Sequence, residues 1–245
     1  MKRFLLFKDW LVEGQMKDAM RWGTKKTDDF HDRKIELLSE IAGKLKGKNW
    51  WIDAGTLLGS VRGGDFIKGD NDIDIGIHAK HMSKELCAKI NESPKLDVAE
   101  GSGDMDKFYK TEIHLLDDDG KRVSVGGKGV FNDIYVYYPV ENDYVMGDSG
   151  KYYRIPKPHL DKLTTGTIRG KRFPIPSDAK NLLEFVYGED WETPNRGKTF
   201  HGNTHSTFMN KLKSYRYDRS TNKGICQYTK AHLNELNEEK KKQSK

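Results

Sequence analysis

Apolar and acidic residues alternate from Asp72 to Ile77, and this alternation is the clearest hydrophobic pattern in the chain. A β-strand places alternate side chains on opposite faces, so Ile73, Ile75 and Ile77 would enter a core together. Asp72 and Asp74 would then share the other face, with their Cα atoms about 6.5 Å apart. The pattern therefore predicts a strand that presents two carboxylates side by side.

Other segments show patterns that predict helices and strands around this acidic strand. Apolar residues at helical spacing predict a packing helix from Asp28 to Leu45, which ends near Gly47. The mixture of elements predicts an α+β fold with a mixed sheet, flanking helices and a small C-terminal helical appendage. The further predicted elements are a strand at 50–53, helices at 56–61, 83–91 and 177–187, antiparallel hairpins within 108–155, and a hairpin at 163–176 that turns at Gly170.

The composition is hydrophilic but sufficient for a folded domain. The chain has 245 residues, of which 33% are charged and 35% hydrophobic, and aromatic residues at 11% provide large core anchors. This length accommodates one main domain with an appendage. We place the main domain at residues 28–192, after an N-terminal segment at 1–27 and before a basic appendage and tail at 193–245.

Charge and cysteine content restrict the class of protein only loosely. The net charge of +6 permits binding of nucleotides, anionic glycans or nucleic acid, but much of the excess lies late in the chain, where a solvated basic surface is the simplest interpretation. No apolar run approaches the roughly 20 residues of a membrane span, and the opening run is broken at Lys8 and Asp9, too early for a signal peptide. Cys87 and Cys226 lack zinc-site spacing and agree with a reducing compartment. We therefore predict a cytoplasmic protein without a transmembrane segment.

A Gly-Thr-Leu-Leu-Gly segment that begins at Gly55 precedes the acidic strand. Backbone amides there could approach phosphate oxygens closely beside Thr56, because glycine has no side chain to obstruct them. Arg62 adds a cation for phosphate, with a salt bridge to Asp65 or Asp70 as the alternative. Carboxylate oxygens are preferred by Mg²⁺ and Mn²⁺. The combination is the layout of a nucleotidyltransferase-fold active site of the polymerase-β type, whereas the acidic strand alone could be a solvated face.

The run from Asp53 to Gly76 closely resembles the LicD family, which includes fukutin and fukutin-related protein. In that family a G-[TS]-L-L-G-x-x-R segment precedes a D-x-D-x-D strand. A second block of similarity has a Pro-bearing strand at 173–176, a helix, and a Tyr-Gly-x-x-Trp ending at Trp191. The resemblance covers roughly residues 50–192. It departs from the family before the acidic residues, where Lys-Gly stands in place of the usual Pro-Trp.

The segment VFNDIYVYY resembles the family's apolar strand with an Asp-Ile pair, which makes Asp133 the third carboxylate. Its alternative interpretation is an ordinary aspartate at a strand edge. Asp70 is expected to lie behind the metal ligands or to face solvent. The resemblance thus implies Asp72, Asp74 and Asp133 as catalytic and metal-binding residues for Mg²⁺ or Mn²⁺, and Gly55, Thr56, Arg62 and Asp70 as substrate-binding residues.

The resemblance implies a divalent-metal-dependent phosphotransferase. It would move a phospho-linked small group, of the phosphocholine or alditol phosphate type, from a CDP-activated donor to a sugar hydroxyl of a glycan or its precursor. The same carboxylates could serve an NTP-dependent nucleotidyltransferase that transfers NMP to a small molecule or to nucleic acid. We do not expect nucleic acid as a partner of the first reaction. A non-catalytic glycan- or nucleic-acid-binding module is the third alternative. The leaving group, CMP or pyrophosphate, distinguishes the two enzymes.

Overall fold

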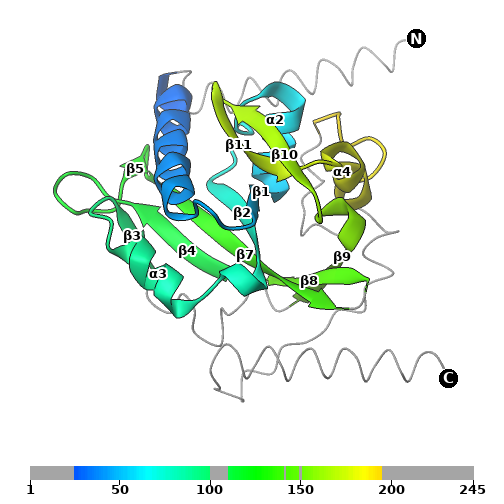
Figure 1. The fold of residues 1–245 in the computed structure, drawn as a ribbon. Helices are drawn as coiled ribbons and strands as arrows, with labels where there is room; N and C mark the ends of the chain where they lie inside the picture. The colour runs from blue at the N-terminus through cyan, green and yellow to red at the C-terminus, as the bar shows by residue number, and fades with distance from the viewer. Residues whose placement is uncertain (1–24, 100–109, 141, 149–150, 195–245) are drawn as a thin grey trace, which may run out of the picture.

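A mixed β-sheet lies at the centre of the protein, with helices packed around it (Figure 1). The structure is a computed structural model and describes residues 25–99, 110–140, 142–148 and 151–194. The sheet has the order β1-β2-β7-β4-β3, and β8 and β9 continue it from β7. These strands are β1 (Trp50–Ile52), β2 (Asp72–His78), β3 (Leu96–Val98), β4 (Lys110–Leu115), β7 (Phe131–Val140), β8 (Asp143–Asp148) and β9 (Lys151–Pro156).

The alternating segment forms β2, as predicted. Its isoleucines Ile73, Ile75 and Ile77 are all completely buried. They belong to the same hydrophobic core as the apolar side of the helix at residues 25–44, which contributes residues such as Leu38 and Ile41. The predicted packing helix is therefore confirmed over the described residues, in which it runs from residue 25 to residue 44. Hydrophobic burial on one face of β2 fixes the register that leaves the aspartates on the other.

In the middle of the chain, β7 pairs antiparallel with β4 and parallel with β2. The sequence pattern predicts antiparallel hairpins there, and the pairs β7–β8 and β8–β9 confirm them, as do the short strands β5 (Ser124–Val125) and β6 (Lys128–Gly129). β7 itself runs parallel to β2, which places Asp133 beside Asp74. Alternation of apolar and polar residues shows that one face of a strand is buried. It does not show whether a strand distant in sequence pairs with it in the parallel or the antiparallel direction.

Capping residues set the limits of the short helices. The side chain of Asp53 accepts a hydrogen bond from the Ala54 amide at 2.9 Å, so α2 (Ala54–Gly63) begins two residues before its predicted start. Gly64, with φ of 67°, ends it in the left-handed conformation. The other helices are α3 (Lys84–Asn91), α4 (Ala179–Tyr187) and the 3-10 helices η1 (Ala79–His81) and η3 (Lys157–His159).

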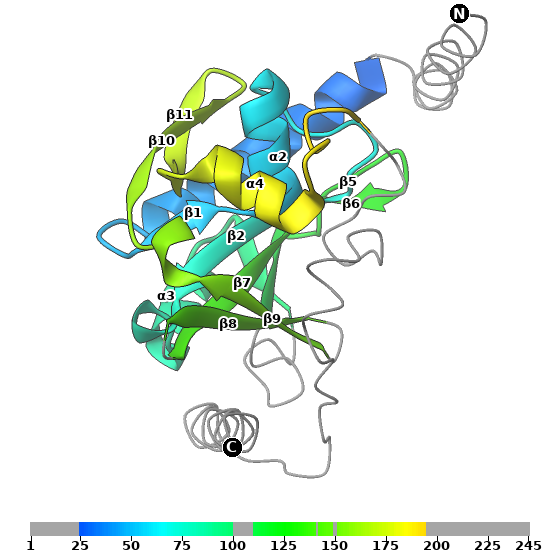
Figure 2. The same cartoon turned by 90° about the vertical axis from the view of Figure 1, so that its right-hand side faces the viewer.

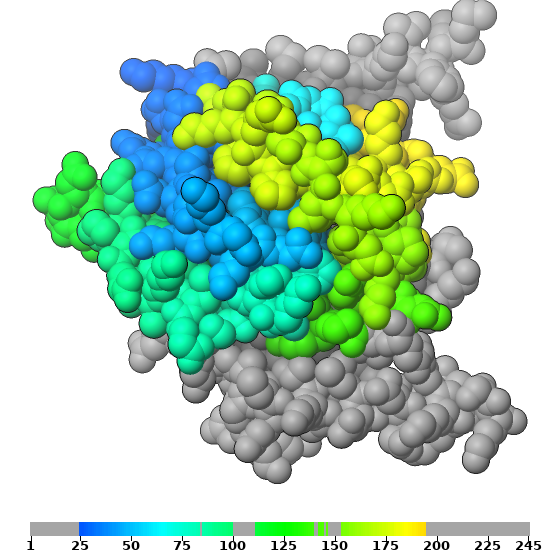
Figure 3. All heavy atoms as spheres, viewed as in Figure 1, coloured from blue at the N-terminus to red at the C-terminus, as the bar shows by residue number. Residues whose placement is uncertain are grey.

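The predicted hairpin at 163–176 forms a separate two-stranded sheet of β10 (Leu163–Ile168) and β11 (Lys171–Pro176). It turns at Arg169 and Gly170, which both have positive φ. The hairpin and α4 lie beside α2 (Figure 2). In the space-filling view the hairpin also adjoins the helix at 25–44 (Figure 3), to which Lys171 donates a hydrogen bond at Ser39. The hairpin therefore packs against both α2 and the helix at 25–44.

Two of the predicted regions fall mainly outside the described residues. The N-terminal segment at 1–27 is described only from residue 25, and the appendage at 193–245 only to residue 194. Cys226 lies outside as well, so the expected domain limits stay predictions. Among the described helices, none has both the length and the apolar character that crossing a bilayer requires.

Candidate metal centre

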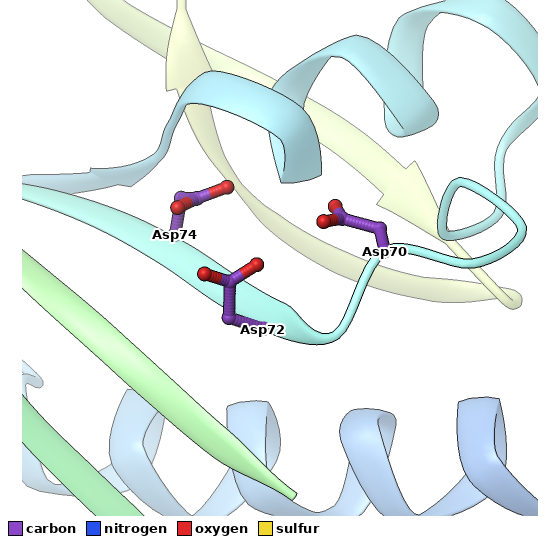
Figure 4. A group of neighbouring side chains, drawn as sticks. All are labelled: Asp70, Asp72 and Asp74. Atoms are coloured by element: carbon purple, nitrogen blue, oxygen red, sulfur yellow. The ribbon is translucent and has the colours of Figure 1, made fainter. Parts of the chain in front are cut away.

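Three carboxylates converge at the start of β2. Asp70, Asp72 and Asp74 each offer an oxygen, and these oxygens all lie within 4.8 Å of one another (Figure 4). We call these three residues the acidic cluster. Asp72 and Asp74 come from β2, as predicted, whereas Asp70 comes from the loop before it. The structure brings the Asp70 carboxylate together with those of Asp72 and Asp74, and its expected place behind the metal ligands stays a prediction.

The position of Asp70 depends on a turn in the chain. Gly69 has φ of 84°, and the Asp70 amide donates a hydrogen bond to the Ile67 carbonyl at 3.2 Å. This turn brings the Asp70 carboxylate back toward β2, where an extended chain would carry it away. The D-x-D-x-D spacing puts Asp70 in phase with Asp72 and Asp74, but the turn that brings its carboxylate close lies before the strand and has no signal in the alternation.

Asp133 lies beside the acidic cluster but outside its ligand group. It is the β7 partner of Asp74 in the parallel pair and is 1% exposed. Among the described residues, the group of acids with mutually close oxygens contains Asp70 in the place where we expected Asp133. The charge of Asp133 nevertheless reaches Asp74 and contributes to raising its pKa. Asp133 is thus placed to act next to the cluster, and its predicted role as a metal ligand stays a prediction.

The Gly-Thr segment holds Asp74 in place. The Asp74 amide donates to the Thr56 hydroxyl at 2.9 Å, and the Thr56 amide donates to a carboxylate oxygen of Asp74 at 3.3 Å. The Asp53 amide donates to the Asp74 carbonyl at 2.9 Å. Two hydrogen bonds therefore fix the backbone of Asp74 and one fixes its carboxylate against the N-terminus of α2, where partial positive charge also stabilises it.

Gly55 is required by the same close approach. A Cβ atom at this position would lie 2.8 Å from a carboxylate oxygen of Asp70 and 3.2 Å from one of Asp74. We interpreted this glycine as leaving room for phosphate to approach the backbone. The structure shows that the carboxylates of Asp70 and Asp74 approach the backbone here, and contact of Gly55 and Thr56 with phosphate stays a prediction.

The electrostatics of the acidic cluster favour a cation. Burial, together with repulsion from Asp72, raises the pKa of Asp70 to about 6 against the opposing effect of Lys34. Burial also raises the pKa of Asp74 well above its usual range, with added repulsion from Asp72, Asp70 and Asp133. Three close carboxylates without a cation repel one another, and a divalent ion would remove this cost. An all-oxygen set suits Mg²⁺ or Mn²⁺, so the residues present fit the predicted metal.

This repulsion predicts a pH-dependent effect of Asp70→Asn in buffer that contains a chelator. Because the folded-state pKa of Asp70, about 6, exceeds its unfolded value, the native state binds more protons and loses stability as the pH rises toward and through 6. The asparagine variant avoids this loss. Its free energy of unfolding should match that of the parent near pH ~4 and exceed it by roughly 2 kcal/mol near pH ~7.

Urea denaturation at a series of pH values measures this difference. Asp118→Asn, at an exposed position between β4 and β5, is the control and should show no such trend. A gap between parent and Asp70→Asn that stays constant across the pH range would contradict the proposed repulsion.

Arg62 has a different partner from those predicted. In the described part of the chain it forms no ion pair with Asp65 or Asp70, so the alternative of a salt bridge is wrong. Its guanidinium instead donates to the carbonyls of Trp191 and Thr193. Arg62 therefore ties the last turn of α2 to the segment after α4. Its contact with phosphate stays a prediction.

The second block of the sequence packs against this site. Tyr187, at the end of α4, is 3% exposed. Its pKa is raised by burial and by the nearby charges of Asp74, Asp53 and Asp70. Arg62 also donates a hydrogen bond to the Trp191 carbonyl, so the Tyr-Gly-x-x-Trp ending packs beside the acidic cluster.

Three residues that support the site, Asp53, Tyr137 and Lys34, had no predicted role. Asp53 is 2% exposed, and one of its carboxylate oxygens accepts a hydrogen bond from the Tyr137 hydroxyl at 2.6 Å. Its position directly before a short helix is a capping signal that could have revealed it. Lys34 is completely buried near the acidic cluster, and helical periodicity gave no sign of its partner.

Comparison with known proteins places this geometry in context. A family model described as LicD/FKTN/FKRP, nucleotidyltransferase domain, matches residues 47–178, which is more than half of the chain. The mouse (Mus musculus) protein named ribitol-5-phosphate transferase FKTN is 26% identical over 75% of this chain and 40% of its own length. The mouse protein named ribitol 5-phosphate transferase FKRP is 25% identical over 65% of this chain and 33% of its own length. The chain therefore spans well under half of these relatives.

Among solved structures, the chain is similar to ANT(2")-Ia in complex with adenylyl-2"-tobramycin. The sequence identity is 16%, the TM-score is 0.39, and the match covers 65% of this chain and 78% of that chain.

Proposed function

This chain belongs to the LicD/FKTN/FKRP family, and from that premise we propose that it is a divalent-metal-dependent phosphotransferase. The reaction centre in this proposal is the acidic cluster together with Asp133. The observation that carries the proposal is the convergence of three carboxylate oxygens within 4.8 Å, inside the segment that the family model matches. The names of the two mouse relatives support transfer of a phosphorylated alditol.

The acidic cluster would hold Mg²⁺ or Mn²⁺. When bound, the metal would offset negative charge on the phosphate oxygens of the donor. The Thr56 amide, which donates to the Asp74 carboxylate, and the Thr56 hydroxyl, which accepts from the Asp74 amide, keep Asp74 oriented for this role. Gly55 and Thr56 at the N-terminus of α2 and the side chain of Arg62 are the proposed contacts for donor phosphate.

The donor in this proposal is a CDP-linked small polar group, of the alditol phosphate or phosphocholine type. An acceptor sugar hydroxyl attacks the phosphorus that carries the small group, and a new P–O bond forms. The bond from that phosphorus to the bridging oxygen breaks, and CMP leaves with the electron pair. The hydroxyl proton passes to a base, for which Asp133 beside Asp74 is the proposed residue.

An NTP-dependent nucleotidyltransferase is the second candidate. The description of the matched family model as a nucleotidyltransferase domain favours it. In that reaction the α-phosphorus of an NTP would lie at the acidic cluster, and pyrophosphate would leave in place of CMP.

The test is a product assay with the purified chain. The chain is incubated with Mg²⁺ or Mn²⁺ and with CDP-ribitol, CDP-glycerol, CDP-choline or each NTP, in the presence and absence of a sugar-bearing acceptor. We expect release of CMP that requires metal and reaches full rate only with acceptor. A chelator should stop the release. Formation of pyrophosphate from an NTP, with no CDP-linked compound consumed, would establish the second candidate instead.

A further inference from the structure

Lys34 is a cation buried beside the acidic cluster. It lies on the helix at residues 25–44 and is 0% exposed, and among the described side chains it is the only lysine or arginine in the buried class. Burial of a charged ammonium group is unfavourable unless nearby groups compensate it. Its position therefore requires an electrostatic explanation.

The direct contacts of Lys34 supply only part of that compensation. Its Nζ atom donates a hydrogen bond to the backbone carbonyl of Asp70 at 3.4 Å. It also lies 4.5 Å from the centre of the Phe66 ring and 5.9 Å from that of Phe30. Among the described residues, no carboxylate comes within ion-pair distance of it. One long hydrogen bond and two aromatic faces are weak compensation for a buried charge.

The remaining compensation comes from the carboxylates of the acidic cluster. Burial has the largest effect on the pKa of Lys34 and lowers it, and Asp70, Asp72 and Asp74, with Asp65 as a smaller contributor, oppose part of this lowering electrostatically. Asp70 connects the two groups. Its carbonyl faces Lys34, while its carboxylate approaches Gly55 and belongs to the acidic cluster.

We propose that Lys34 is a fixed counter-charge of the metal centre, which holds Asp70 in place and weakens the binding of the divalent cation. The proposal rests on the metal centre of the proposed function. In the metal-free protein the ammonium group offsets part of the charge of three close carboxylates. A divalent cation that binds these carboxylates is repelled by the same ammonium group, across an interior that screens charge poorly. Lys34 thus keeps the cation exchangeable with each catalytic cycle.

Two substitutions separate the charge of Lys34 from its hydrogen bond. Lys34→Gln removes the charge and keeps a donor for the Asp70 carbonyl, and Lys34→Met removes both. The full chain is titrated with MnCl₂ alone, and binding is followed by thermal shift and by the electron paramagnetic resonance signal of free Mn²⁺. If Lys34 repels the cation, the dissociation constant should fall at least about tenfold in Lys34→Gln, and by less in Lys34→Met, which also loses the hydrogen bond that holds Asp70. Lys26→Gln, at an exposed position of the same helix, makes the same change in net charge and should bind as the parent does.

The outcomes distinguish this inference from the proposed function. If the parent binds Mn²⁺ and Lys34→Gln binds it equally or more weakly, the inference is overturned while the metal centre stands. If neither the parent nor the variants bind Mn²⁺, the metal centre itself is overturned. Variants that fold only with Mn²⁺ would support the inference. Variants that fold neither with nor without Mn²⁺ would overturn it, because Lys34 would then serve the fold irrespective of the charge of the site.

Discussion

Asp74→Asn is expected to lower turnover by at least about a thousandfold while the protein stays folded. The loss follows because a neutral amide is a poor ligand for a divalent ion, and stabilisation of phosphate charge is worth several kcal/mol. The fold should persist because the Thr56 amide can donate to the amide oxygen of asparagine as it does to the carboxylate. Removal of one charge also relieves repulsion from Asp72, Asp70 and Asp133.

Release of CMP from the donor found in the product assay measures this effect, and circular dichroism with thermal melting checks the fold. Asp72→Asn should behave in the same way. Asp118→Asn is the matched control, since it removes a carboxylate from an exposed turn away from β2. Full activity in both the Asp72 and the Asp74 variants would remove these residues from the reaction.

Gly76→Ala is expected to lower the free energy of unfolding by about 3 kcal/mol, because it overpacks the core. A Cβ atom at this position would lie 2.3 Å from the Trp51 indole. Trp51 is completely buried and cannot swing away, since it packs against the rings of Tyr137 and His78 with centre distances of 5.0 and 5.1 Å. The glycine in the acidic strand is thus required by a tryptophan on β1.

Urea denaturation of parent and variant measures the loss. Gly129→Ala on β6 is the control, because an added Cβ there meets no atom within 4 Å. The control should change stability by less than about 0.5 kcal/mol. Equal stability of the Gly76 and Gly129 variants would show that Trp51 accommodates the extra methyl group and that the packing argument is wrong.

The parts of the fold that depend on local pattern could be predicted from the sequence. Alternation identified β2 and the side of it that carries Asp72 and Asp74, and helical spacing identified the helix at 25–44. Gly170 marked the turn of the β10–β11 hairpin. In each case the decisive forces act between residues close in sequence or between a strand face and the core.

The parts that depend on distant contacts could not be predicted in this way. Asp70 joins the acidic cluster through a turn outside the strand, and Arg62 contacts carbonyls more than a hundred residues later in the chain. Lys34 sits on a helix that was predicted from its apolar residues, and that pattern gave no sign of the carboxylates that compensate it. Such partners are set by tertiary packing, which a single sequence does not display.

We expect the acidic cluster to bind the divalent metal on which the proposed phosphotransfer depends. An anomalous difference map from crystals of this chain grown with MnCl₂ and CMP tests this binding. A peak should lie about 2.0 to 2.6 Å from carboxylate oxygens of Asp70, Asp72 and Asp74, with the phosphate of CMP next to it. A map in which CMP is bound but Mn²⁺ is absent from these three carboxylates would show that the acidic cluster is not the metal site.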